Sequence, residues 1–334
     1  MRNRNTIIPF VCLFLLLIGC KPKELERISL EAIPLQALTM ERLVRVPGQF
    51  PPRPSMLTDD IILLTHPISS SFMGVYQLGD SAVSRHKLKK KGDHIPVPNS
   101  QIDTTFQLFN QHTLATYQVQ NGTLTLTDFV RFTFARDKSP EQVVTLNDDL
   151  YACLGSYLGG LFGLCKRKKK EMRYTGAFPT EDMALRRLLH SNSSGRMDKQ
   201  GDQIVYANRS VGYIAAFTYS FGRLRKQWDK QLTDYVYQTK EGHITFDPDE
   251  HRSGFSDIHI TDRHIYTLYW GQTRSMGLEV PNSIVVFNRD GEPVSRFSLP
   301  DQMTFIAVDS REEYLYATYS PLMNECYLVR FKLP

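Results

Sequence analysis

The chain has 334 residues, 41% of them hydrophobic, and a formal net charge of +5. That charge is too small for a chain of this length to indicate a nucleic-acid-binding protein. Five cysteines are too few for disulfide bonds to stabilise so long a chain, so its stability must come from a hydrophobic core.

The first residues have the layout of an export signal. Arg2 and Arg4 precede an uncharged run, Thr6 to Ile18, that is rich in Leu, Ile, Phe and Val. The run is shorter than the roughly 20 apolar residues that a membrane-spanning helix needs, and polar residues follow it. We therefore expect residues 1–19 to be a signal peptide, whose removal lowers the formal charge from +5 to +3.

The end of this run, Leu17-Ile18-Gly19-Cys20, resembles the lipobox of bacterial lipoproteins, in which a small residue precedes an acylated cysteine. We predict that Cys20 carries acyl chains such as palmitate and that residues 20–24 form a tether. Each buried methylene contributes about 0.8 kcal/mol, so more than one chain gives firm membrane attachment. The body would then be extracytoplasmic and lipid-anchored at the outer membrane, on its periplasmic or cell-surface side. The alternative is a short transmembrane anchor with an incidental thiol.

The remaining cysteines do not form a disulfide framework. Cys12 leaves with the signal and Cys20 is lipidated, so Cys153, Cys165 and Cys326 remain. An odd number excludes complete pairing. We expect at most one disulfide, between Cys153 and Cys165, and favour three buried thiols that pack as small hydrophobes.

From Glu24 onward, short strands alternate with turn signals, and Thr180 to His190 predicts one helix with Thr180 as N-cap. A weak repeat consists of acidic or polar residues followed by a β-branched and aromatic strand. Its copies are spaced by about 40 to 60 residues, which is the size of a propeller blade, and about six fit in the chain. The copies begin at Asp59-Asp60, Asn110-Gln111, Asp148-Asp149, Asp202-Gln203, Thr261-Asp262 and Arg311-Glu312-Glu313.

The chain ends on a strand, Tyr327 to Leu333, after which nothing remains to complete its blade. We predict that residues from about Leu25 to Val46 supply the missing outer strand, because an open blade would expose unpaired backbone groups. The expected fold class is therefore all-β: a six-bladed β-propeller with one short helix, over residues 25–334. A large twisted sandwich is the alternative.

Residues 147–238 contain, in order, a strand, a Gly-rich turn, a Phe-Pro exit, a short helix and a blade rich in glycines and aromatics. Together with the lipobox and six irregular blades, this order resembles the TolB-like six-bladed propeller lipoproteins of the Bacteroides type. Residues 89–99, KKKGDHIPVPN, depart from the Gly-Pro-rich turn that many members carry in an early blade. The resemblance implies a fold and a membrane address, and it supplies no catalytic residue.

Strong chemical motifs are absent from the sequence: it contains no His-Glu-x-x-His helix, Gly-x-Ser-x-Gly elbow, phosphate-binding Gly loop or Cys-x-x-Cys pair. Asp247 to His251, with Asp257 nearby, could attract Ca²⁺ but lacks the pattern of an EF-hand loop, so we expect a solvated acidic turn. His259 and His264 flank a hairpin on different strands, which does not indicate a shared metal. No catalytic residue, metal or cofactor is predicted.

Two basic runs, Lys87 to Lys91 and Lys166 to Lys170, could contact anionic lipid headgroups. We favour the simpler interpretation that they are charged turns between outer strands, which discourage pairing at sheet edges.

Loops that follow the second strand of each blade emerge on one side of a propeller, where they commonly surround a concave site. The longest of them runs from Trp270 to Asn282. Aromatic and arginine side chains on this side would suit a glycan, a peptide or a protein ligand. The predicted ligand-binding residues are Trp270, Arg274, Tyr157, Arg209 and Tyr319. The alternative is that Trp270 and the tyrosines pack between blades.

The favoured function is a membrane-anchored, non-enzymatic propeller that binds a ligand or partner. The alternative is a hydrolase or lyase that acts on a polysaccharide or lactone at the central channel. Two carboxylates facing each other across the channel mouth, or a histidine with a metal, would favour the enzyme. Aromatic side chains and scattered arginines would favour binding.

Overall fold

The computed structural model describes residues 25–334 apart from short internal stretches (67–69, 93–94, 97–104, 111, 121–122, 133–139, 156, 158–159, 168–171, 177–194, 241–242, 277–280 and 323–324). The expected signal peptide, tether and helix at Thr180 to His190 lie outside the described residues. Within the described residues, no helix is long and apolar enough to cross a membrane.

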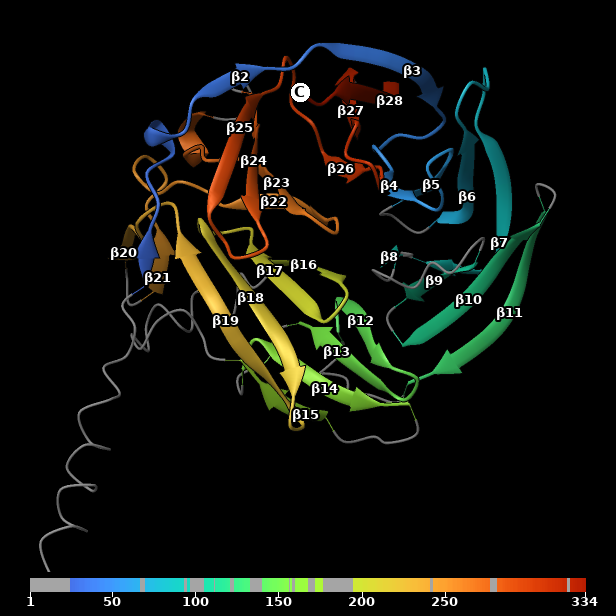
Figure 1. The fold of residues 1–334 in the computed structure, drawn as a ribbon, viewed down its shortest axis with the longest axis horizontal. Coiled ribbons are helices and arrows are strands. Elements are labelled where there is room, and N and C mark those ends of the chain that lie inside the picture. The colour runs from blue at the N-terminus through green and yellow to red at the C-terminus, as the bar shows by residue number, and fades with distance from the viewer. Residues whose placement is uncertain are drawn as a thin grey trace, which may run out of the picture.

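Six sheets form a ring around a central channel, which confirms the predicted six-bladed β-propeller (Figure 1). Blade 1 contains β4 (Arg53–Met56), β5 (Ile61–Thr65), β6 (Ser70–Gln77) and β7 (Ser84–Gly92), and blade 2 contains β8 (Ile95–Pro96), β9 (Thr105–Asn110), β10 (Thr113–Gln120) and β11 (Thr123–Arg131). Blade 3 contains β12 (Gln142–Asn147), β13 (Leu150–Leu154), β14 (Phe162–Lys166) and β15 (Met172–Thr175).

Blade 4 contains β16 (Gly195–Gln200), β17 (Gln203–Asn208), β18 (Tyr213–Ser220) and β19 (Arg223–Gln231), and a separate hairpin of β20 (Tyr237–Lys240) and β21 (His243–Phe246) follows it. Blade 5 contains β22 (Phe255–Ile260), β23 (His264–Tyr269), β24 (Ser283–Asn288) and β25 (Pro293–Ser298). Blade 6 contains β26 (Phe305–Val308), β27 (Tyr314–Leu322) and β28 (Glu325–Lys332).

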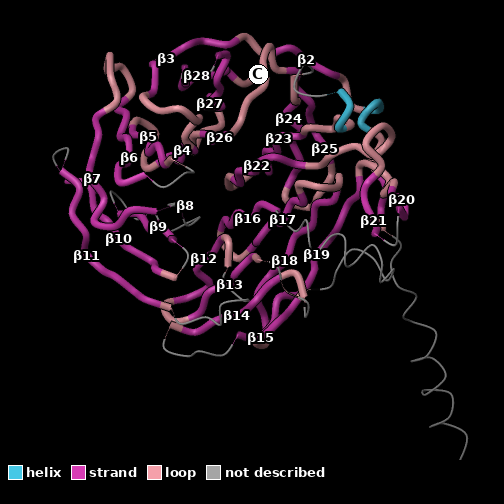
Figure 2. The backbone as a smooth tube through the Cα atoms, turned by 180° about the vertical axis from the view of Figure 1, so that it is seen from behind, coloured by secondary structure: helices cyan, strands magenta, loops and turns pink. Residues whose placement is uncertain are grey.

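The N-terminal segment runs along the outer edges of three successive blades, and we call residues 25–46 the belt (Figures 1 and 2). Its strands β1 (Glu26–Arg27) and β2 (Leu35–Ala37) pair in parallel with β19 and β25. Its last strand, β3 (Met40–Val46), pairs antiparallel with β28 and completes blade 6. The belt therefore covers the sheet edges of blades 4, 5 and 6, which would otherwise expose unpaired backbone groups.

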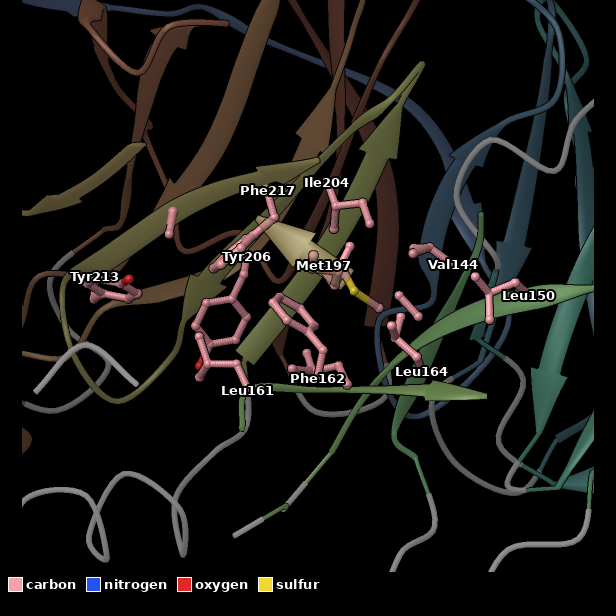
Figure 3. Close-up of a cluster of buried hydrophobic side chains, with 14 of the residues drawn as sticks. Val144, Leu150, Leu161, Phe162, Leu164, Met197, Ile204, Tyr206, Tyr213 and Phe217 are labelled. Carbon is pink, nitrogen blue, oxygen red and sulfur yellow. The ribbon is translucent and has the colours of Figure 1, made fainter. Parts of the chain in front are cut away.

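The core lies between neighbouring blades. In the cluster of Figure 3, Phe162 of blade 3 packs edge-on against two rings of blade 4, with ring centroids 4.9 Å from Phe217 and 6.0 Å from Tyr206. Similar buried clusters join each other pair of adjacent blades, including blade 6 to blade 1. The hydrophobic effect therefore holds the whole ring together.

The three cysteines of the described chain are buried and free. The sulfur atoms of Cys153 on β13 and Cys165 on β14 lie 3.1 Å apart, whereas Cys326 lies in blade 6. All three pack within apolar clusters or beside them, as expected for cysteines that serve as small hydrophobes.

Candidate functional site

The two ends of the central channel are built from different connections. Antiparallel pairing places the turn between the first two strands of blades 1, 4, 5 and 6 at one end, and the connection after the second strand at the other. We call these the turn end and the loop end. The turn end contains residues 57–60, 201–202, 261–263 and 309–313, and the loop end contains the residues that follow Asn208 and Tyr269.

A cavity of about 480 Å³ occupies the channel from its turn end as far as Arg53, the first residue of β4. The inner strands β4, β16, β22 and β26, which contact one another around the channel, provide most of its wall. The lining includes two basic side chains, Arg53 and Lys199. It also includes four carboxylates: Asp59, Asp198, Asp262 and Asp309. A concave, polar site of this kind is the usual place for a ligand in a propeller.

Each of the four carboxylates already accepts hydrogen bonds from the protein. Asp198 accepts the backbone N–H groups of Lys199 (2.8 Å) and Ile260 (2.7 Å). Asp309 accepts those of Glu313 and Tyr314 at 2.8 and 3.3 Å. The other two carboxylates also accept hydrogen bonds. Asp59 accepts them from the backbone N–H and the hydroxyl of Ser310, and Asp262 accepts one from the side-chain amide of Gln200. These carboxylates therefore fix turns and join blades.

Asp198 is the channel carboxylate with the most unusual surroundings. Burial raises its pKa, and the nearby His259, with Nδ1 3.9 Å from Oδ2, together with the two amide donors only partly offsets this effect. A carboxyl group with a raised pKa beside a histidine is the arrangement in this cavity that most resembles general acid–base chemistry.

Polar side chains on the inner strands join successive blades. The side-chain oxygen of Gln142 accepts the backbone N–H of Met197 in the next blade at 3.0 Å. In the same way, the carboxylate of Asp198 accepts the backbone N–H of Ile260 in blade 5. The carboxylate of Asp257 accepts the backbone N–H of Ile306 in blade 6 at 3.0 Å. Each bond satisfies a buried backbone donor at the inner edge of a sheet.

A charged cluster crosses the channel at its loop end. Asp257, 1% of whose side chain is exposed, lies 2.9 Å from Nη2 of Arg53 and 4.0 Å from Nε of Arg196. The three residues belong to blades 5, 1 and 4 respectively. Burial, together with the nearby Arg53, lowers the pKa of Arg196 to about 10. Sequence reasoning missed this cluster, because the three charged residues lie on inner strands that are far apart in the sequence.

The structure corrects two of the predicted ligand-binding residues. Tyr157 is 2% exposed, and its ring lies 5.4 Å from that of Tyr174 within the core between blades 2 and 3. Tyr319 is fully buried, and its hydroxyl accepts a hydrogen bond from Nε of Arg42 at 2.9 Å. Neither ring has a free face for a ligand, so both are core residues, as the alternative interpretation held.

The other three predicted residues lie at the loop end, but they do not form one site. Trp270 is half-buried and lines a separate cavity of about 310 Å³ with Tyr269, Arg252 and Arg296. Arg274 is exposed, begins a short 3-10 helix (Arg274–Met276) and does not line that cavity. Arg209 is exposed and lies close enough to Arg196 to affect its pKa.

The weaker candidates have structural roles. Asp247 accepts the backbone N–H groups of Asp249 and Glu250, which fixes the predicted acidic turn. His251 stacks on Phe246, with ring centroids 3.9 Å apart. His264 bonds to Glu312. Among the described residues, no group of three His, Cys, Asp or Glu side chains could hold a metal ion.

The first basic run has a different position from the one expected. Lys87 to Lys91 lies within β7, the outer strand of blade 1, and not in a turn. Charges on an outer strand still oppose pairing with another chain. Most of the second run, residues 168–170, lies outside the described residues.

Comparisons with known proteins agree with this architecture. Residues 227–311 match the model of the TolB-like 6-blade propeller-like family, so the predicted resemblance is confirmed. A crystal structure of a protein of unknown function from Bacteroides thetaiotaomicron has a TM-score of 0.52 and 10% identity, over 89% of this chain and 76% of that one. The β-propeller domain of Cps50 (Swd1) from Myceliophteria thermophila has a TM-score of 0.48 and 9% identity, over 89% of this chain and 100% of that one. No curated protein matches the sequence.

Proposed function

Starting from a TolB-like six-bladed propeller, we propose that this protein is a membrane-anchored, non-enzymatic binding protein whose ligand enters the central channel. The observation that carries the proposal is the cavity of about 480 Å³ at the turn end. Its carboxylates are occupied by hydrogen bonds from the protein, while Arg53 and Lys199 also line it. Such a site offers fixed polar contacts to a ligand.

The membrane anchor is the second part of the proposal, and it rests on the lipobox-like Leu17-Ile18-Gly19-Cys20. Acylation of Cys20 would hold the propeller at the outer membrane on its extracytoplasmic side. Replacing Cys20 with alanine should release the protein from membranes, because acyl chains are the proposed attachment. Retention of Cys20→Ala in membranes after high-salt and carbonate washes would contradict the anchor.

Binding at the channel can be tested by filling the cavity. Ser55 lines it, and Ser55→Phe should block a ligand by volume alone. Ser295→Phe, on the outer strand of blade 5, is the matched control. At least one ligand from a panel of glycans and peptides should raise the melting temperature of the parent and of Ser295→Phe. The same ligand should leave the melting temperature of Ser55→Phe unchanged. If Ser55→Phe binds every hit as well as the parent does, the site lies elsewhere, and the cavity beside Trp270 is the next candidate.

The alternative function, a hydrolase or lyase, is favoured by the raised pKa of Asp198 beside His259. Both oxygens of Asp198 accept backbone N–H groups, which leaves this carboxyl little freedom to exchange protons with a substrate. The enzyme hypothesis requires the parent to release product from a polysaccharide or lactone. It also requires Asp198→Asn, and not Asp262→Asn, to abolish that release.

A further inference from the structure

Three arginines from different elements lie at the loop end of the channel. Arg53 is the first residue of β4, and Arg196 is the second residue of β16. Arg209 directly follows β17, whose last residue, Asn208, pairs with Gly195 beside Arg196. The antiparallel register therefore brings Arg196 and Arg209 to the same end of blade 4.

The positive charge of this cluster is not balanced. Oδ2 of Asp257 accepts the backbone N–H of Ile306, which leaves Oδ1 to face both Arg53 at 2.9 Å and Arg196 at 4.0 Å. Glu141 is the other acidic residue close enough to affect Arg196, and it is exposed. Two largely buried guanidinium groups thus share one carboxylate oxygen, an arrangement that costs free energy unless a further anion is present.

Arg196 also has an unused hydrogen-bond donor. Its Nε is buried and has no hydrogen-bond partner in the described structure, and its Nη1 makes only a long contact of 3.5 Å with the carbonyl of Gly195. Arg53 is held in place by its ion pair with Asp257 and by the ring of Phe305, whose centroid lies 4.8 Å from the guanidinium carbon of Arg53. Donors held in place in this way suit a planar or tetrahedral oxyanion.

We propose that Arg196, Arg209 and Arg53 form an anion-binding site at the loop end of the channel, for the carboxylate, phosphate or sulfate of a small ligand. The inference deepens the proposed function, because it names the chemical class of the ligand that the channel takes. The exposed Arg209 meets the anion at the entrance, and Arg196 supplies the buried donor. Asp257 offsets part of the repulsion between the two inner arginines, because its Oδ1 faces both of them.

The test uses small probes and two arginine variants of the full chain. Binding of inorganic phosphate, inorganic sulfate and glucuronate is measured by calorimetry, with glucose as the neutral control. We expect at least one anion to bind, with an affinity that falls as salt is added. Arg196→Met and Arg209→Ala should each weaken it about tenfold or more. Preference among the three probes identifies the anionic group.

Matched controls separate a lost site from a damaged fold. Arg223→Ala removes an exposed arginine from β19, the outer strand of blade 4, and should leave anion binding unchanged. Because Arg209 is exposed, Arg209→Ala should have the same melting temperature as the parent. The proposal is overturned if no anion binds, if glucose binds as well as glucuronate, or if both cluster variants bind like the parent. A ligand whose binding is lost in Ser55→Phe but kept in both cluster variants would preserve the proposed function and refute only the anion site.

Discussion

The ammonium group of Lys230 lies 2.7 Å from the carboxylate of Glu26, which ties the outer strand of blade 4 to the first strand of the belt. Lys230 also lies 2.9 Å from Glu292 in the turn between β24 and β25 of blade 5. Only 3% of the Lys230 side chain is exposed, whereas both glutamates are about half exposed. One buried cation therefore joins the belt and two blades.

Replacing Lys230 with methionine should destabilise the propeller. The loss should be about 1–2 kcal/mol, between the values for exposed and for fully buried ion pairs, because the two glutamates can regain water. Thermal unfolding should show a decrease of a few degrees. Lys226→Met is the matched control on the same strand, since Lys226 is 42% exposed and pairs locally with Asp229. Equal melting temperatures for Lys230→Met and Lys226→Met would show that the buried contact contributes nothing.

Removing the belt should destabilise the whole ring. A variant without residues 25–46 loses the buried Val44 and Val46 as well as the β3 pairing. Each buried valine contributes about 1.5–3 kcal/mol, so the total loss should exceed about 3 kcal/mol. The uncovered edge of β28 should also promote self-association, which sedimentation measures. A variant without residues 25–38 retains β3 with Val44 and Val46, so it should lose less stability and keep the edge of β28 covered. If the longer truncation melts within a degree or two of the parent, this segment is only a linker.

Glu312 predicts a specific dependence of stability on pH. Burial raises its pKa, but hydrogen bonds from Thr261 and His264 outweigh burial, so the pKa lies below its ordinary value of 4.5. A carboxyl group whose pKa is lowered by folding stabilises the protein above its unfolded-state pKa, and this stabilisation is lost as the pH falls through the folded-state pKa.

Glu312→Gln should therefore cost about 2 kcal/mol at neutral pH, the usual range for charged hydrogen bonds, and should reduce the loss of stability on acidification. Denaturant unfolding between neutral pH and pH 3 measures both effects. The neighbouring Glu313→Gln serves as control, because the Glu313 side chain is 52% exposed. A parallel pH dependence for Glu312→Gln and the parent would refute this role.

The cysteines predict a thiol count. Three free thiols should be found after denaturation of the reduced mature protein, apart from any modified Cys20. Treatment with a mild oxidant should lower the count to one, because only Cys153 and Cys165, with sulfur atoms 3.1 Å apart, lie within reach of each other. A Cys153→Ala variant should keep both of its thiols under the same treatment. Fewer than one free thiol per oxidised parent chain is incompatible with this arrangement.

Local sequence signals were sufficient for the blades. One example is Asn288-Arg289-Asp290-Gly291, which contains the Asp-Gly pair typical of hairpin turns. These residues form a turn in which the Asn288 side chain accepts the backbone N–H groups of Asp290 and Glu292, and Gly291 has a φ of +87°. These contacts involve residues close in sequence, so a short window contains the information. The closing strand was predictable as well, because an unfinished last blade requires a partner.

The site was not predictable in the same way. Tyr157, Tyr319 and Trp270 are all aromatic residues at or near a loop, but the first two are buried by residues of other strands. Burial of this kind depends on contacts between blades, which no local pattern records. The cluster of Arg53, Arg196 and Asp257 likewise exists only because the ring brings three distant inner strands together.

The belt also determines how the molecule would stand on a membrane. Its first strand, Glu26–Arg27, lies on the outer rim of blade 4, away from either mouth of the channel (Figure 1). With a lipid on Cys20, as proposed, the few residues before Glu26 could span at most about 20 Å even when fully extended. The lipid would therefore attach the propeller at its outer edge, with the channel axis parallel to the membrane. Both mouths would then face sideways into solvent, and ligands could approach either one without passing the membrane.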